Sequence, residues 1–133
     1  MIISKQGKMS ANYNYFKNII KGKKINVIMV KEGDRVHVDK NIYFDILFPE
    51  DTLINSNILN NNSIVAKLHY NKFSMIFTGD IESIAEKQII NKYVDTKKLK
   101  TTILKVAHHG SKSSSIQSIL DLMQPEIALI GVG

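Results

Sequence analysis

Two short polar motifs contain the residues of this sequence best suited to chemistry. Thr78-Gly79-Asp80 follows the apolar run 73–77, and His108-His109-Gly110-Ser111 follows the apolar run 102–107. At both places an expected strand passes into an expected helix. Carboxylate and imidazole groups are good ligands for Zn²⁺ and Mn²⁺. We therefore take three residues as candidate catalytic and metal-binding residues: Asp80, His108 and His109.

The second half of the chain is patterned to bring these motifs together. It reads as strand, helix, strand, helix, strand, with the strands at Phe73–Thr78, Thr102–Ala107 and Ile127–Val132. Successive strands in such units run parallel, so their carboxyl ends meet at one edge of a sheet. We expect Asp80 to lie within ~5 Å of the histidines, which allows one ion between ligands at ~2 Å each.

The first half of the chain is richer in strands. A helix is expected over Asn12–Gly22, with Tyr13 and Phe16 facing a core. Four strands are then expected, and the last joins the first strand of the second half in a hairpin that pairs Tyr70 with Phe73. They are Ile25–Val30 (buried), Arg35–Val38 (half-exposed), Ile42–Phe48 and Ser63–Tyr70. The fold class is α/β, a sheet covered by helices, with Asn55–Asn62 as a long loop in which Asn60–Asn62 are solvated.

Structural roles compete with the chemical ones. Asp80 is well placed to cap the helix that follows it, as are Ser111 and Ser113–Ser115 at the next helix. Free amides at that second helix start could instead hold an anion such as phosphate. In the helix after Asp80, Ile81, Ile84 and Ile89 are expected on the inner face and Glu86 on the outer face. His37 and His69 are expected on the surface.

Composition limits the classes of function. The chain has 133 residues, a net charge of +6 and no cysteine, which excludes disulfides and thiolate zinc sites. It contains no apolar stretch long enough for a transmembrane segment and no visible signal peptide. Its positive charge comes from 17 lysines and one arginine, so an alternative function is a non-catalytic basic module that binds nucleic acid.

The order of motifs resembles that of metallo-β-lactamase-fold hydrolases, most closely the hydrolase domain of ComEC-type DNA-internalisation competence proteins. The resemblance rests on four segments: 61–63, 77–82, 104–111 and 130–133. It implies an αββα sandwich and metal-assisted hydrolysis of a phosphodiester such as DNA, at the extracytoplasmic face of a membrane. It also implies Asp80 and one of the two histidines as metal ligands, with substrate-binding roles for Ser111, Asn62 and Ser63.

The resemblance is incomplete at both ends. The family's first metal motif, His-x-(His or Asp)-x-Asp-His, does not occur in this sequence. We therefore expect residues 1–133 to be a partial domain that lacks the N-terminal metal-motif half and the last strand region. Such a chain would have an incomplete zinc or manganese site, weak or no activity alone, and apolar surface where the other half packs.

Overall fold

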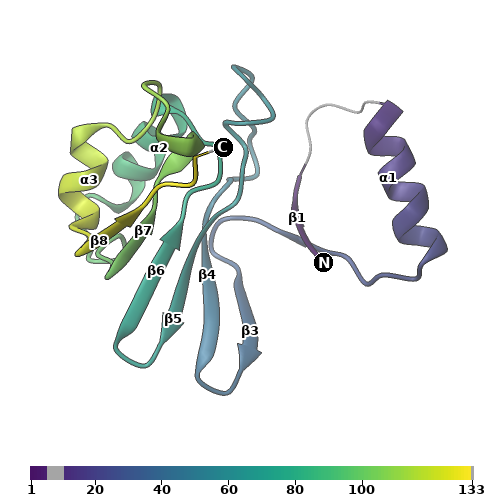
Figure 1. Ribbon diagram of the computed structural model, residues 1–133, viewed down its shortest axis with the longest axis horizontal. Helices are drawn as coiled ribbons and strands as arrows, with labels where there is room; N and C mark the ends of the chain where they lie inside the picture. The colour runs from purple at the N-terminus through teal and green to yellow at the C-terminus, as the bar shows by residue number, and fades with distance from the viewer. Residues whose placement is uncertain (6–10, 133) are drawn as a thin grey trace.

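A six-stranded mixed sheet forms the centre of the computed structural model, which describes residues 1–5 and 11–132 (Figure 1). Its strands follow one another in sequence order across the sheet; they are β3 (Arg35–Asp39), β4 (Ile42–Phe48), β5 (Val65–Tyr70), β6 (Phe73–Phe77), β7 (Ile103–Lys105) and β8 (Ile127–Leu129). The first four strands are antiparallel, whereas β6, β7 and β8 are parallel. The fold is therefore mixed α/β, as the sequence predicts.

The expected hairpin forms with the expected register. Tyr70 pairs with Phe73, and the pairing continues through Leu68 opposite Met75. The strand expected over Ile42–Phe48 has those bounds in the structure. These strands were predictable because alternating apolar residues and a two-residue turn leave little freedom in the pairing.

Two helices connect the parallel strands and lie on the same side of the sheet (Figure 1). They are α2 (Ser83–Tyr93) and α3 (Gln117–Met123). The main core lies between them and the sheet, and its fully buried members include Ile76, Ile89 and Leu104. The expected inner face of α2 is wrong at two places, since Ile84 is 44% exposed. Glu86 is buried instead, and it has a structural role described below.

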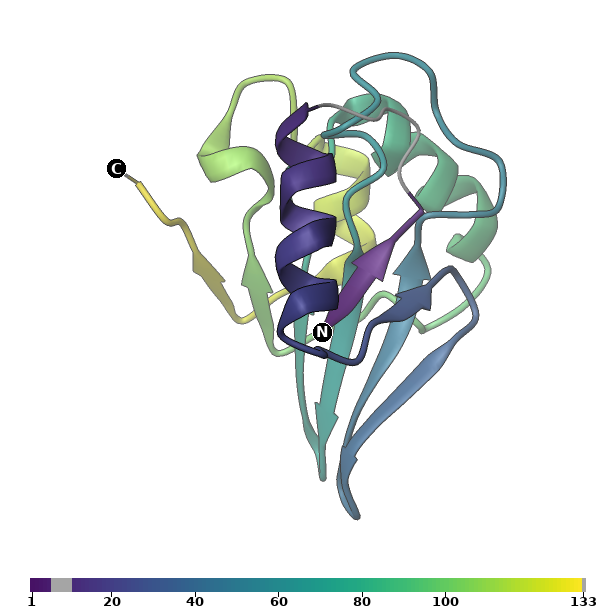
Figure 2. The same cartoon turned by 90° about the vertical axis from the view of Figure 1, so that its right-hand side faces the viewer.

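The N-terminal segment lies on the other side of the sheet (Figures 1 and 2). It comprises β1 (Ile2–Ser4), α1 (Ala11–Gly22) and β2 (Ile28–Val30), with β1 and β2 paired in parallel. The helix is present as predicted, but its core role is wrong because none of its residues is buried. Of the strand expected to be buried over Ile25–Val30, only Val30 is buried.

The last strand also differs from its prediction. Every residue of β8 is exposed, although Ile127–Val132 was expected to be a buried strand. The cause is its place at the edge of the sheet, where it pairs with β7 alone. The final residue, Gly133, lies outside the described part of the chain.

The helices of residues 1–5 and 11–132 include none with both the length and the hydrophobicity that crossing a bilayer requires.

Candidate active site at the ends of β6 and β7

Two hydrogen bonds join the polar motifs at the carboxyl ends of β6 and β7. The Thr78 hydroxyl donates to the Lys105 carbonyl over 2.6 Å. The His108 backbone N–H donates to the Gly79 carbonyl over 3.0 Å. Because both bonds connect the ends of neighbouring parallel strands, one from a side-chain hydroxyl and one between main-chain groups, they fix the position of Asp80 relative to the histidines.

Asp80 faces His109 at this edge. Its Oδ1 atom lies 3.8 Å from His109 Nε2, and both side chains are about half exposed, at 48% and 64%. The expected proximity, within ~5 Å of the histidine pair, is confirmed. Asp80 does not cap α2: the residue before the first helical residue is Glu82, so the capping alternative is wrong for Asp80.

The orientation of His109 is set by its second ring nitrogen. His109 Nδ1 lies 2.8 Å from the Gly131 carbonyl oxygen. A carbonyl only accepts hydrogen bonds, so Nδ1 carries the proton and donates it. In the neutral ring Nε2 is then the unprotonated nitrogen, and it lies 3.8 Å from Asp80 Oδ1. A histidine that donates one N–H to a backbone carbonyl and keeps the other nitrogen free is in the state that binds metal ions.

His108 has a different environment. Its Nδ1 atom is buried without a hydrogen-bond partner, 3.7 Å from Glu82 Oε1. Its Nε2 atom lies 3.5 Å from the Asn60 side-chain amide nitrogen. The His108 ring therefore lies against Glu82 and Asn60, whereas His109 lies beside Asp80. Which of the two histidines binds a metal ion stays a prediction.

The backbone of the histidine motif is strained. His108 and His109 have φ angles of 46° and 54°, and Gly110 follows at 79°. Left-handed backbone at a residue with a side chain costs about 1–3 kcal/mol and is concentrated at functional sites. This short 3₁₀ turn over Ala107–Gly110 therefore holds two costly conformations that present the His109 ring at the edge.

Glu82 makes several hydrogen bonds to neighbouring loops, a role that the sequence did not indicate. Its carboxylate accepts hydrogen bonds from Asn57 and Asn61, over 3.0 and 3.2 Å, and from the Ser113 hydroxyl over 3.4 Å. Its backbone N–H donates to the Asn61 side chain over 2.9 Å. Glu82 thus connects three loops around His108. Its position two residues after Asp80 was the only sequence signal for it.

The asparagine-rich loop is not solvated as expected. Asn61 and Asn62 are buried, at 0% and 3% exposed. The Asn62 side-chain oxygen accepts a hydrogen bond from the Ile54 N–H, and the Asn62 side-chain nitrogen donates to the Ile54 carbonyl. The same nitrogen donates to the Ile58 carbonyl over 2.6 Å. These bonds hold the loop in a compact form. A substrate-binding role for Asn62 stays a prediction.

Ser63 packs directly against the first motif. A side chain added at Gly79, which has a φ of 56°, would place its Cβ 2.7 Å from Ser63 Cβ. Glycine is therefore required beside Ser63 both by space and by backbone conformation. Ser111 lies nearby, where its hydroxyl is 3.0 Å from that of Ser113. The predicted substrate-binding roles of Ser63 and Ser111 are not tested by these contacts.

The start of α3 is capped from another helix. The Glu86 carboxylate of α2 accepts the backbone N–H groups of Ser115 and Ile116, over 2.6 and 3.0 Å. The expected serine cap is therefore wrong, and these two amides are not free to hold an anion. Burial raises the pKa of Glu86, and the two hydrogen bonds from Ile116 and Ser115 oppose that effect.

Asp80 and His109 supply two donors, and within residues 1–5 and 11–132 no group of three or more His, Asp or Glu side chains is arranged to hold a metal ion. The fit of a metal therefore depends on ligands in addition to these two.

No family model matches the sequence. The chain is 36% identical to ComE operon protein 3 of Bacillus subtilis over 104 residues, which cover 78% of this chain and 13% of that protein. This chain is similar to part of a much longer protein. It is also 33% identical over 92 residues to Recombination protein 2 of Haemophilus influenzae, covering 69% of this chain and 11% of that protein. A third relative, 36% identical over 70 residues, is the Escherichia coli protein YcaI.

Proposed function

We propose that this chain is part of a metal-dependent hydrolase of the metallo-β-lactamase type, in which Asp80 and His109 bind a divalent metal ion. The observation that carries the proposal is the His109 ring, whose Nδ1 atom is held by the Gly131 carbonyl while Nε2 lies 3.8 Å from Asp80 Oδ1. His109 is proposed as the ligand in place of His108, because the ring nitrogens of His108 lie 3.7 Å from Glu82 and 3.5 Å from Asn60.

The two donors have suitable separation and chemistry for one ion. Ligand atoms at about 2.1 Å from zinc can be at most about 4.2 Å apart, so 3.8 Å is within reach. A catalytic zinc normally has three protein ligands and one open position. Further ligands would therefore come from other parts of the protein, as the resemblance to the hydrolase family implies.

The bound metal would lower the pKa of a water molecule and stabilise charge on a phosphoryl oxygen. Other residues of this chain would hold the two metal ligands in position. Gly131 fixes the tautomer of His109, and the bond from His108 N–H to the Gly79 carbonyl fixes the distance between the two motifs. Glu82 holds the surrounding loops in place through Asn61. The donors are thus positioned before any ligand binds.

The proposed substrate is a phosphodiester, most directly DNA, as part of DNA uptake. The resemblance to ComEC-type domains and the names of two relatives, which refer to a ComE operon and to recombination, support a role with DNA. In the whole protein, we propose that the six-stranded sheet is one half of an αββα sandwich. The exposed apolar residues of the N-terminal segment, including Phe16 and Met29, would then be covered by the other half.

Metal titration of single variants tests the ligand assignment. Zn²⁺ or Mn²⁺ is added to the wild type and three variants, with backbone NMR signals near the site as the readout. Asp80→Ala and His109→Ala should each weaken binding at least tenfold, because each removes a direct ligand. His108→Ala should weaken it less, provided that thermal unfolding shows an intact fold. An equal loss of metal affinity in His108→Ala and His109→Ala would contradict the assignment. Metal affinity of Asp80→Ala equal to that of the wild type would refute the site.

A separate measurement of DNA binding in EDTA distinguishes the alternative of a non-catalytic basic module. Such a module would bind DNA in EDTA with strong salt dependence, and Asp80→Ala would leave that binding unchanged. Metal-dependent cleavage of DNA by the longer protein, abolished by Asp80→Ala, would support the hydrolase.

A further inference from the structure

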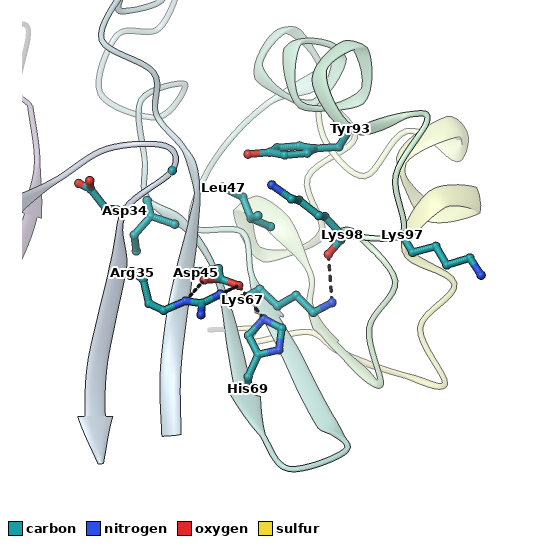
Figure 3. Close-up of a pocket in the computed structure, with 11 residues that line it drawn as sticks. Asp34, Arg35, Asp45, Leu47, Lys67, His69, Tyr93, Lys97 and Lys98 are labelled. Atoms are coloured by element: carbon teal, nitrogen blue, oxygen red, sulfur yellow. Dashed lines mark hydrogen bonds and ion pairs between the residues drawn. The ribbon is translucent and has the colours of Figure 1, made fainter. Parts of the chain in front are cut away.

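A polar cavity of about 500 Å³ lies on the α2 side of the sheet, above β3, β4 and β5 (Figure 3). Its lining includes several charged or titratable groups: Asp34, Arg35, Asp45, Lys67, His69, Lys97 and Lys98. It is separate from the Asp80 edge. Helix α2 begins near Asp80 and ends at Tyr93, which lines the cavity, and eleven helical residues span about 16 Å.

One wall of the cavity is a neutralised and ordered charge cluster. Arg35 donates two hydrogen bonds to Asp45, over 2.6 and 3.1 Å, and its guanidinium lies 4.2 Å from the Tyr43 ring centre. The His69 ring stacks on the Tyr43 ring, with the ring centres 4.6 Å apart. The His69 Nε2 atom lies 3.1 Å from the Asp45 carboxylate. Since His69 is half-buried here, its expected surface position is only partly correct. The Asp45 charge is thus balanced by Arg35.

The opposite side of the cavity has two ammonium groups without such a balance. Lys67 is 8% exposed, and its amine donates to the Lys98 and Lys100 carbonyls over 3.0 and 2.5 Å. Those bonds use two of its three N–H donors. The Lys98 amine lies inside the cavity, 5.4 Å from the Tyr93 ring centre, whereas Lys97 points away (Figure 3).

Among the described residues, neither Lys67 nor Lys98 has a carboxylate within ion-pair distance. Burial lowers the pKa of Lys67, an effect that Asp45 opposes, so an added negative charge here would relieve an unfavourable buried cation. The cavity therefore combines a fixed ammonium donor, Lys67, with a second ammonium group, Lys98, neither of which is in contact with a carboxylate, and such groups are suited to binding an oxyanion.

We propose that this cavity binds the phosphate group of a nucleotide-sized ligand, with the Lys67 and Lys98 ammonium groups as its donors. The volume exceeds that of a phosphate ion and falls in the range of small-molecule sites. Leu47 and the Tyr93 ring provide an apolar wall for the rest of the ligand (Figure 3). The phosphate belongs to a free nucleotide or to a nucleic-acid strand. This proposal does not depend on the metal site.

Phosphate titration without metal tests the cavity. Inorganic phosphate, deoxyadenosine monophosphate and a short single-stranded oligonucleotide are added separately to the full chain in EDTA, and backbone NMR signals are followed. Each probe that binds should shift the signals of Arg35, His69 and Lys98 in a saturable manner. Lys98→Met should weaken binding at least fivefold, because it removes one donor but keeps the backbone carbonyl that holds Lys67.

Two further variants make the result decisive. Lys67→Met should abolish binding, and a thermal scan shows whether it remains folded. Lys87→Met, on the exposed face of α2, removes the same charge elsewhere and should leave binding within twofold of the wild type. Loss of only strand binding in Lys98→Met assigns the phosphate to nucleic acid, and loss of only mononucleotide binding assigns it to a free ligand. Equal losses in Lys98→Met and Lys87→Met, or no saturable shifts with any probe, would overturn the proposal. Because EDTA is present throughout, neither result depends on the hydrolase proposal.

Discussion

The N-terminal segment and the body formed by the six-stranded sheet with α2 and α3 differ in how far they bury their own apolar residues. Helix α1 has no buried residue, and Phe16 is 41% exposed. In α2, by contrast, Ala85 and Ile89 are almost completely buried. Both helices have apolar residues at helical spacing. The difference shows that an apolar pattern specifies a helix locally but does not specify what covers it.

The comparison also separates two kinds of dependence. The body fixes its own geometry, down to the hydrogen bonds that join the ends of β6 and β7. The N-terminal segment contacts the rest of the chain through Val30, which packs with Ile46 and Ala66, and through the buried Ser4, whose hydroxyl donates to the Asn62 carbonyl. We therefore expect substitutions in the body to change stability strongly and those in the segment to change it weakly.

The largest effect is expected for Ile89→Ala, because Ile89 is 1% exposed within the main core. Truncating such a side chain costs about 2–5 kcal/mol in lost burial and residual cavity. Urea unfolding, with an unchanged dependence on denaturant, measures the loss. A loss below about 1 kcal/mol would mean that the body is no better packed than the N-terminal segment.

Glu86→Gln is expected to change both stability and its pH dependence. The variant keeps the shape but weakens the two amide hydrogen bonds at the start of α3, each worth about 1.5–3 kcal/mol when the acceptor is charged. Because burial raises the pKa of Glu86, the folded state binds more protons than the unfolded one above pH 4.5. Its contribution to stability is therefore greatest at low pH and falls as the pH rises through the raised value.

Unfolding free energies at several pH values above 4.5 would show this slope in the wild type and a flatter profile in Glu86→Gln. Lys87→Gln, one residue along on the exposed face, is the control and should keep the wild-type slope. If the two variants have the same profile, Glu86 is not the group responsible.

An intermediate loss of stability is expected for Gly79→Ala, with Gly22→Ala as its control. Gly79→Ala should cost about 1–2 kcal/mol for left-handed backbone, and more because the new Cβ would lie 2.7 Å from Ser63 Cβ. Gly22→Ala, at the end of α1, meets nothing within 4 Å and should be near neutral. Adding Ser63→Gly to Gly79→Ala should recover the steric part of the loss. A double variant no more stable than Gly79→Ala would attribute the cost to the backbone alone.

The smallest effect is expected for Phe16→Ser in α1. This side chain lines a shallow groove with Ile3 and Val27 but is not buried, so the loss should be below about 1 kcal/mol. Thermal unfolding of the variant beside Ile89→Ala provides the measurement. A loss as large as that of Ile89→Ala would show that the N-terminal segment is stabilised by its own packing after all.

The sequence predicts those features that depend on local pattern or on strand order. The hairpin register at Tyr70 and Phe73 follows from alternation, and the proximity of Asp80 to the histidines follows from parallel strands. Residue type predicts burial wrongly where a hydrogen-bond partner far away in the sequence determines it. Glu86 was placed outside because it is charged, but the amides of α3 lie 29 and 30 residues away in the chain and make burial favourable.

The closeness of Asp80 to His109 was predictable, whereas the groups that hold these two residues in place were not. Nothing in the sequence indicates that Gly131 presents a carbonyl to His109, because every residue has one. The role of Asn61 was hidden for a similar reason, since asparagine is typical of solvated loops. Its burial depends on Glu82, 21 residues further on.

The order of the strands has a consequence for how the chain folds. Strands β3 to β6 follow one another, and β3–β4 and β5–β6 are connected by short turns, so their pairing requires mostly short loops to close and such hairpins form in about 1–10 μs. The pairing of β6 with β7 must wait for α2 to form and cross the sheet, which makes it a slower, non-local step. His109 gains its Gly131 contact only when the segment after β8 has joined as well. The proposed metal ligands are therefore assembled at the end of folding, and a partly folded chain would have Asp80 in place without an oriented histidine.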